Sequence, residues 1–194
     1  MEHLTKRITE WLIVSKAVEA DDRELYEYAI YSMLITISPL FLVMVIGILM
    51  GTLVEGVFLI IPFMCIRKFS GGYHAKTFKI CFVSSCGLLI LCMYLASHIN
   101  YGFWVSALLL VSVISLSLWS PIDSENRRLE QDEKIKYRRT TIWISLVFTI
   151  IHFALLLMGY KYLAVSIAVG LMLSAGLQLP CVIQLFRTES KELS

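Results

Sequence analysis

Six long apolar runs constrain the fold of this chain more than any other feature of its sequence. They lie at roughly 29–50, 52–66, 80–97, 101–121, 141–158 and 162–186. A helix that crosses a bilayer needs about 20 apolar residues, within a range of about 17 to 25. The composition agrees, because 58% of the residues are hydrophobic and 16% are charged, against about 45–50% and 25% in soluble domains. We therefore predict an all-α membrane protein with six transmembrane helices, forming a single polytopic domain over residues 1–194.

The second apolar run is short and carries Glu55 near its start. An ionisable residue at membrane depth is a functional candidate by default. Glu55 also lies near the expected membrane face, where its carboxylate would simply reach water. The sequence leaves both interpretations open.

The basic residues are distributed very unevenly among the connections between the runs. Of the 17 Lys and Arg, 16 lie in the N-terminal segment, in the connections after the second and fourth runs, or in the C-terminal tail, and Lys161 is the exception. The positive-inside rule then places both termini in the cytoplasm. The opposite connections are too short for an external domain, so we expect the chemistry within the membrane or on its cytoplasmic side. A net charge of +2 does not indicate a nucleic-acid partner.

Residues 2–19 are predicted to form an amphipathic helix. Apolar side chains recur there at near-helical spacing, namely Leu4, Ile8, Trp11, Leu12 and Val18. A helix with Trp and Leu on one side and mixed charges on the other suits the membrane interface. Packing against the cytosolic face of the protein itself is an equally good interpretation of the same pattern.

One polar stretch, residues 67–81, contains the residue types needed for covalent catalysis. It contains the pair Gly71-Gly72, the imidazole of His74 and the thiol of Cys81. A thiol and a nearby His are the minimum for a nucleophile and its base. In one straight helix the two residues would be about 10.5 Å apart along the axis, whereas proton transfer needs roughly 3 Å or one bridging water. A catalytic pair therefore requires a non-helical segment between them.

We expect His74 on a turn after the glycine pair and Cys81 in the first turns of the third span. A helix N-terminus and neighbouring cations stabilise a thiolate, and the stretch holds four basic residues, namely Arg67, Lys68, Lys76 and Lys79. The spacing of His74 and Cys81 alone is weak evidence, since a Cys in an apolar run is more often a small core residue. Alternatively, these basic residues serve only to set the orientation of the protein in the membrane.

The motif Arg67-Lys68-Phe69-Ser70-Gly71-Gly72-Tyr73-His74-Ala75-Lys76-Thr77-Phe78-Lys79-Ile80-Cys81 resembles the core of the AgrB family (accessory gene regulator protein B). The family pattern has an Arg, a Gly pair, a His-Ala and a Cys seven residues after the His, and this chain matches each position. The resemblance extends to chain length, six spans and a polar loop that opens at Ser120. It departs at Arg127-Arg128, where many relatives have Lys-Pro.

The resemblance implies a bacterial cytoplasmic-membrane cysteine endopeptidase that acts in quorum sensing. Cys81 would attack a peptide bond near the C-terminus of a small AgrD-like precursor, with His74 as the general base. The resulting thioester would be released as a cyclic thiolactone or lactone autoinducing peptide. Arg67, Gly71 and Gly72 would support the site. The resemblance further implies a homodimer, and no cofactor or metal is expected.

The acidic tail that such precursors carry gives a role to the cations of the polar stretch. Lys68, Lys76 and Lys79 would attract that tail by Coulomb steering. The positive-inside rule explains any single one of these Lys equally well.

The rival hypothesis is a non-enzymatic peptide or small-molecule transporter. Glu55, His152 and Gln178 would then line a pathway through the apolar runs. A transporter usually shows paired broken helices in two related halves, and no such halves are visible in the sequence. For His152 itself, a hydrogen bond between helices is the more common role. A third possibility, a membrane adaptor with a degenerate site, is disfavoured because the His and the Cys are both present.

Overall fold

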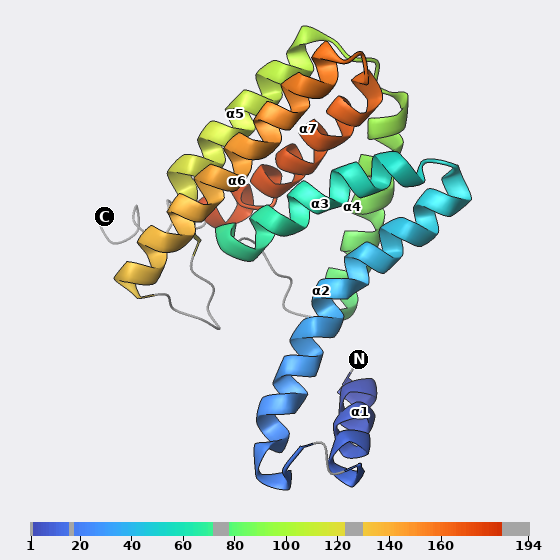
Figure 1. The fold of residues 1–194 in the computed structure, drawn as a ribbon, viewed down its shortest axis with the longest axis vertical. Coiled ribbons are helices and arrows are strands. Elements are labelled where there is room, and N and C mark those ends of the chain that lie inside the picture. The colour runs from blue at the N-terminus through green and yellow to red at the C-terminus, as the bar shows by residue number, and fades with distance from the viewer. Residues whose placement is uncertain (1, 16–17, 72–77, 123–129, 184–194) are drawn as a thin grey trace. The chain divides into compact units, whose positions relative to one another are not determined.

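The computed structural model describes residues 2–15, 18–71, 78–122 and 130–183, and all secondary structure in these ranges is helical. The elements are α1 (Glu2–Val14), a 3₁₀ turn (Ala20–Asp22), α2 (Arg23–Met50), α3 (Leu53–Ser70), α4 (Phe78–His98), α5 (Phe103–Trp119), α6 (Gln131–Leu157) and α7 (Lys161–Gly176) (Figure 1). The all-α prediction is thus confirmed. The chain divides into two units, Met1–Leu42 and Val43–Ser194.

The predicted apolar runs fall on α2 to α7, and several helices continue into polar sequence. α3 includes Arg67 and Lys68, and α6 begins at Gln131, well before the apolar run at 141–158. The early start of α6 has a local cause, because Glu130 and Glu133 form a reciprocal capping box that satisfies backbone donors at the helix N-terminus. In contrast, α1 ends at Val14, short of the predicted residue 19.

Two helices in the described part of the chain are long and apolar enough to cross a membrane, by length and composition. They are Gln131–Leu157 and Lys161–Ile183, the second of which continues past α7 through a turn at residues 177–178. The count of six spans and the interfacial role of the N-terminal helix stay predictions.

The first unit contains α1 and the first part of α2. Arg23 links the two helices, since its guanidinium donates to Glu27 at 3.0 Å on its own helix and to Glu10 of α1 at 3.2 Å. Thr5 and Thr9 of α1 are buried, whereas Trp11 is 67% exposed. The apolar Trp11 is therefore left uncovered within this unit.

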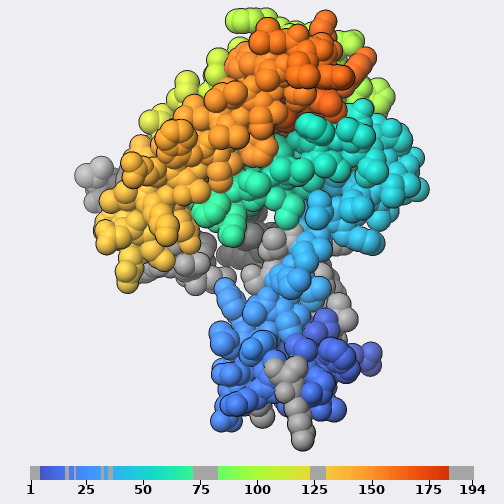
Figure 2. Space-filling view, in the orientation of Figure 1, coloured from blue at the N-terminus to red at the C-terminus, as the bar shows by residue number. Residues whose placement is uncertain are grey.

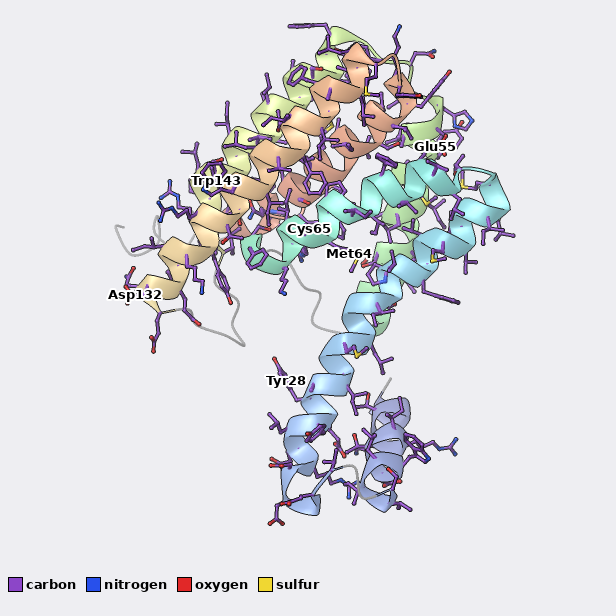
Figure 3. All side chains as sticks on the ribbon, viewed as in Figure 1. Tyr28, Glu55, Met64, Cys65, Asp132 and Trp143 are labelled. Atoms are coloured by element: carbon purple, nitrogen blue, oxygen red, sulfur yellow. The ribbon has the colours of Figure 1, made fainter. Side chains whose placement is uncertain are left out.

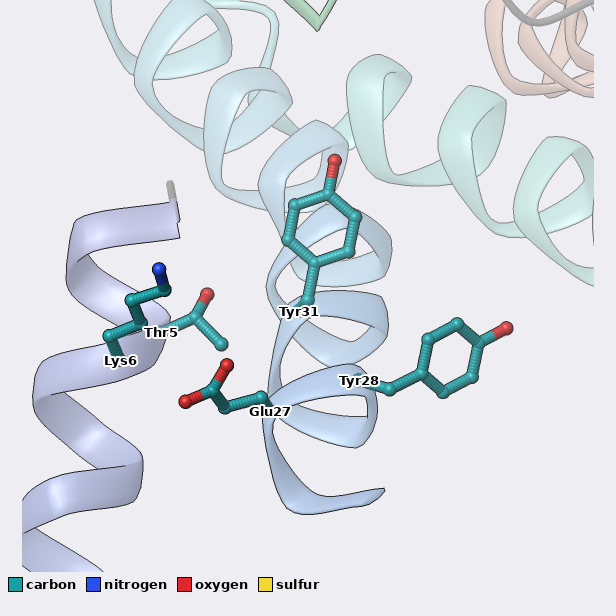
Figure 4. Close-up of a pocket in the computed structure, with 5 residues that line it drawn as sticks. All are labelled: Thr5, Lys6, Glu27, Tyr28 and Tyr31. Carbon is teal, nitrogen blue, oxygen red and sulfur yellow. The ribbon is translucent and has the colours of Figure 1, made fainter. Parts of the chain in front are cut away.

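A shallow pocket of about 340 Å³ lies between the two helices of the first unit. It is lined by Thr5, Lys6, Glu27, Tyr28 and Tyr31. Lys6 and Glu27 project into the space between α1 and α2 (Figure 4). The pocket thus has one cation, one carboxylate and two phenol rings on its walls.

In the second unit, α7 is the central helix. Its side chains from Ala164 to Ala175 are almost all buried, and it packs against α3, α4, α5 and α6. A cluster of buried side chains joins these helices, namely Ile66, Leu116, Ile167, Leu171 and Ala175. α6 forms much of the visible surface of this unit (Figure 2). α7 is thus enclosed by its own chain.

A close helix contact in the second unit is made at Gly170 of α7. A Cβ atom placed there would collide with the carbonyl oxygen of Leu59 and would lie 3.0 Å from Pro62 of α3. Small residues permit such close backbone approach between helices in a membrane. Gly170 therefore determines how closely α3 packs on α7.

The outward faces of the second unit are strongly apolar. Trp143 on α6 (Figure 3) is 63% exposed and Leu157 on the same helix is 90% exposed, and Phe103 on α5 is 84% exposed. Monomeric soluble proteins rarely expose extended apolar surface, and large patches mark protein or membrane contacts. These outer faces are suited to lipid.

Candidate functional site

The candidate site begins where α3 ends, at the start of the polar stretch. Gly71 follows the helix with φ +68° and ψ −158°, a combination that is essentially restricted to glycine. Arg67 donates from Nη1 to the carbonyl oxygen of Gly71 at 2.8 Å, and the hydroxyl of Ser70 donates to the same oxygen at 3.2 Å. Basic side chains commonly satisfy the free carbonyls at a helix C-terminus in this way. The beginning of the polar stretch is thus held by its own helix.

A second set of hydrogen bonds holds the same point from two distant segments. The carbonyl oxygen of Ser70 accepts from the backbone N–H of Ile122 at 3.0 Å and from Nε2 of Gln178 at 3.0 Å. Nε2 of Gln178 also donates to Oγ of Ser120 at 2.9 Å. We call these four residues, Ser70, Ser120, Ile122 and Gln178, the Ser70 clamp.

The Ser70 clamp is sealed from solvent. Ser70 is 0% exposed, Gln178 is 1% exposed and Ser120 is 4% exposed. A carbonyl oxygen only accepts hydrogen bonds, so the amide nitrogen of Gln178 must be the atom that faces Ser70. The amide oxygen of Gln178 is buried and has no hydrogen-bond partner among the described residues. Water cannot readily replace these hydrogen bonds, and each of them therefore restricts the backbone.

Gly71 is required at the clamp for a second, steric reason. A Cβ atom at this position would fall far inside van der Waals contact with the carbonyl oxygen of Ile122. The segment 120–122 thus crosses directly over Gly71. Gly71 combines a glycine-only backbone conformation with a backbone contact that leaves no room for a side chain.

Five of the eight predicted site residues are described only in part or not at all. Gly72, His74 and Lys76 lie outside the described residues. Lys79 and Cys81 belong to the first turn of α4, but their side chains are not among those described. The pairing of His74 with Cys81 therefore stays a prediction.

The remaining predicted cation, Lys68, lies on the last turn of α3 and is exposed. Its ammonium group is 5.6 Å from the centre of the Phe69 ring. Phe69 in turn packs edge-on against Tyr137 of α6, with ring centres 5.6 Å apart. At the same end of the bundle, Arg138 of α6 donates to the carbonyl oxygen of Ser117 at 3.1 Å. α3, α5 and α6 are thus tied together near the start of the polar stretch.

A second buried polar group lies elsewhere in the bundle, around His152. Its Nδ1 lies 2.8 Å from the carbonyl oxygen of Ala164 and its Nε2 lies 3.0 Å from Oγ of Ser106. Because the carbonyl only accepts, Nδ1 carries the proton, Ser106 donates to Nε2, and Tyr101 donates to Ser106 at 2.9 Å. The expectation that His152 bonds between helices is confirmed, since the chain of hydrogen bonds joins α5, α6 and α7.

The three residues that the transporter hypothesis would place along one pathway lie in different environments. Glu55 lies in the first turn of α3 (Figure 3). His152 contacts α7 at Ala164, whereas Gln178 follows the other end of that helix, roughly 20 Å away at 1.5 Å per residue. His152 and Gln178 are both buried and hydrogen-bonded within the bundle. No common pathway is needed to explain either side chain.

The described residues offer no metal site, since none of their His, Cys, Asp and Glu side chains form a group of three or more that would hold an ion. The cysteines whose side chains are described are free thiols, namely Cys65, Cys86, Cys92 and Cys181. Cys65 is exposed on α3 (Figure 3) and Cys92 is buried. These thiols lie in apolar sequence outside the polar stretch, and Cys65 is two residues before its start.

Sequence reasoning missed the partners that hold the polar stretch. The sequence assigns no role to Ser70 or Ser120 individually, and it suggests Gln178 only as a lining residue of a transport pathway. The available signal was a Gln that interrupts an apolar run, because a buried amide must find partners. Its partners lie 108 and 58 residues away along the chain, and no local pattern connects them.

Comparison with known proteins gives one consistent result. The sequence model of the family described as accessory gene regulator B, AgrB, matches residues 5–184. A protein of Clostridium perfringens (strain SM101 / Type A) named as AgrB-like is 22% identical over 184 residues, which cover 90% of this chain and 85% of that protein. A second such protein from Clostridium perfringens (strain 13 / Type A) is 22% identical over 145 residues, covering 70% and 67%. No solved structure matches the chain.

Proposed function

The chain belongs to the accessory gene regulator B (AgrB) family, and from this we propose that it is a membrane-embedded cysteine endopeptidase that processes a small AgrD-like precursor peptide. The carrying observation is the family match over residues 5–184, which includes the whole polar stretch with His74 and Cys81. The family and the two candidate spanning helices indicate a membrane protein that takes part in the accessory gene regulator system. The enzymatic step is the proposal.

In the proposed reaction, Cys81 is the nucleophile and His74 is the base. His74 takes the thiol proton, and the sulfur attacks the carbonyl carbon of a peptide bond near the C-terminus of the precursor. The C–N bond breaks, the proton passes to the leaving amine, and the acyl group remains on Cys81 as a thioester. Because α4 begins at Phe78, Cys81 lies in its first turn, where free backbone N–H groups favour a thiolate.

The second step closes the ring of the product. A thiol or hydroxyl within the bound precursor gives its proton to His74 and attacks the thioester carbonyl. The C–S bond to Cys81 then breaks, and His74 passes that proton to the departing sulfur. A Cys in the precursor gives a thiolactone and a Ser gives a lactone. Transfer of the acyl group from Cys81 to a thiol of the precursor keeps it as a thioester, whereas attack by water would release a free acid. A site set partly in the membrane restricts water and therefore favours cyclisation.

The cations of the polar stretch are proposed to receive the precursor. Lys68 is exposed at the end of α3, and Lys76 and Lys79 follow within the same stretch. Positive charge at this position would raise the local concentration of an acidic tail. We further propose that two copies of the chain associate, as the family implies, so that each membrane complex carries two polar stretches.

Cleavage by site-directed variants tests the proposed function. The precursor and each variant are reconstituted together in vesicles, and the released C-terminal fragment is quantified. Cys81→Ala should abolish cleavage, and His74→Ala should lower the rate by about 10²–10⁴-fold, the usual contribution of a general base. Full activity in either variant, with the protein present at the normal level, would exclude the corresponding role.

A further inference from the structure

A pocket of about 480 Å³ lies between α5 and α6, beside the N-terminus of α5 and the C-terminus of α6. The two helices run side by side (Figure 1). Most of the pocket wall is apolar, with Ala107 and Leu110 from α5 and Phe153 and Leu157 from α6. Its volume falls within the range of about 300–1,000 Å³ that is usual for small-ligand sites. The pocket is therefore large enough for a small apolar molecule or for part of a lipid chain.

Tyr101 and Ser106 provide the polar end of this pocket. Behind them, Nδ1 of His152 donates to the Ala164 carbonyl at 2.8 Å, so Nε2 of the neutral ring accepts from Ser106 at 3.0 Å. This bond uses the only proton of the Ser106 hydroxyl, and Tyr101 therefore donates its own proton to Ser106 at 2.9 Å. The hydrogen bonds thus run in one direction, from the pocket wall into the bundle.

The direction of these bonds determines what the pocket can recognise. The phenol oxygen of Tyr101 has given its proton to Ser106, and none of the residues that the structure describes donates to that oxygen. It therefore offers lone pairs only. A hydroxyl or ammonium group beside it gains a hydrogen bond, whereas an ether or carboxylate oxygen meets no donor. The polar end of the pocket thus favours a ligand that donates.

We propose that this pocket binds a membrane lipid, with an alkyl chain between α5 and α6 and with a hydroxyl or ammonium group of the lipid head donating to Tyr101. The inference concerns neither Cys81 nor the precursor, and it does not depend on the proposed reaction.

A lipid is the occupant that fits the surroundings of the pocket. The rim is apolar and strongly exposed at Phe103, 84%, and Leu157, 90%, and α6 is a helix that is long and apolar enough to cross a membrane. Tyr101 lies in the connection between α4 and α5, and Tyr residues near the ends of spanning helices are enriched at the depth of the lipid head groups. From Phe103 to Leu110 the wall follows α5 for about 10.5 Å. A chain can therefore lie along the helices while its head stays beside Tyr101.

Two photoreactive probes test the requirement for a donor. One is a dodecanol analogue with a diazirine in its chain, and the other is the methyl ether of the same molecule, which keeps the chain and loses the donor. The protein is held in phosphatidylcholine vesicles, whose head group carries no hydrogen-bond donor, at about pH 8, where imidazole is neutral. Labelling of the α5 and α6 peptides is quantified by mass spectrometry against probe concentration. The alcohol should label the pocket at a concentration about 2- to 10-fold lower than the ether, the effect of one net hydrogen bond.

Four variants separate the contributions to labelling. Tyr101→Phe keeps the ring and removes the acceptor, so labelling by the alcohol should fall to the level of the ether. Ser106→Ala releases the Tyr101 proton for donation to the ether oxygen, so the preference for the alcohol should shrink. Ala107→Phe fills the pocket and should abolish labelling by both probes. Ala154→Phe is the matched control and should change neither, because Ala154 is exposed on α6 outside the pocket wall.

The outcomes bear on separate parts of the inference. Equal labelling by the two probes in the unaltered protein would overturn the requirement for a donor, and an undiminished preference in Tyr101→Phe would exclude Tyr101 as the acceptor. Labelling that survives Ala107→Phe would overturn the site itself. Displacement of the bound alcohol by the precursor would assign the pocket to the peptide and overturn the lipid as its occupant. Because Tyr101 is only partly buried, Tyr101→Phe keeps the inference testable if Ser106→Ala does not accumulate in the membrane.

Discussion

At the scale of single residues, two separate factors require glycine at position 71, namely its backbone conformation and the lack of space for a side chain. Gly71 and Gly51 both have positive φ, +68° and +69°. A Cβ at Gly51 would have no atom within 4 Å, whereas a Cβ at Gly71 would collide with the Ile122 carbonyl. Both positions therefore disfavour a side chain through their positive φ, and Gly71 adds a steric conflict that Gly51 lacks.

We predict that Gly51→Ala costs about 1–2 kcal/mol through backbone strain alone. Gly71→Ala should cost more, because φ +68° with ψ −158° is essentially restricted to glycine and because an oversized group adds about 1–3 kcal/mol. Thermal unfolding of both variants in detergent micelles measures the difference. Equal losses of stability would show that the segment 120–122 does not lie against Gly71.

The cysteines give a second prediction at this scale. We expect chains that lack Cys65, Cys86, Cys92 or Cys181 to keep precursor cleavage, since these thiols lie in apolar helices and outside the polar stretch. Cys92→Ala is the variant most prone to lose stability, because Cys92 is 7% exposed and its removal leaves a small cavity. Loss of cleavage in a stable variant of this set, with activity retained in Cys81→Ala, would reverse the assignment of the nucleophile.

Part of the candidate site was accessible from the sequence at the residue scale, and part was not. The Gly pair predicted a sharp turn, and Gly71 has the backbone conformation that such a turn needs. The bond from Arg67 to the Gly71 carbonyl follows from a basic residue in the last helical turn. The role of Gln178 was beyond reach, because it depends on segments that only tertiary packing brings together.

At the scale of helices, the close contact between α3 and α7 is the feature most open to test. Gly170 and Gly176 both lie on α7, but only a Cβ at Gly170 would meet another helix. Gly176→Ala should be neutral or stabilising by up to about 1 kcal/mol, from helix propensity. Gly170→Ala should destabilise the protein by about 1–3 kcal/mol, because α3 must move away.

Thermal unfolding of the two glycine variants under identical detergent conditions checks this prediction. A loss of stability in Gly176→Ala equal to that in Gly170→Ala would contradict the packing of α3 on α7. The same measurement bears on the candidate site, since Ser70 lies at the end of α3 and Gln178 directly follows α7.

The apolar runs predicted the existence of the helices but not their arrangement. A helix that is hydrophobic all round is buried either in a core or in lipid, so periodicity alone does not separate the two. Small and polar residues interrupt α7, including Gly170 and Ser174, and these were the available hint that other helices approach it closely. The apolar runs did not predict the polar ends of α3 and α6. Several charged residues are good helix formers, so a helix can continue beyond the point where its apolar run ends.

At the scale of the whole molecule, the distribution of basic residues predicts the topology. A reporter that is active only outside the cytoplasm should be silent when fused at Ser194 and active when inserted at Asn100. An active reporter at Ser194 would place the C-terminus outside. An inactive reporter at Asn100 would contradict the two predicted spans that flank this residue. A fusion after Lys161 should behave like the insertion at Asn100.

The central claim is that Cys81 carries the precursor as a thioester. The most direct measurement is the mass of the intact protein after mixing with a precursor whose internal Cys or Ser is replaced by Ala, so that no ring can close. The account predicts that the protein gains the mass of the N-terminal fragment at Cys81, that hydroxylamine removes this mass, and that Cys81→Ala never acquires it. Release of the C-terminal fragment with no covalent intermediate, or equal release by Cys81→Ala, would contradict the account.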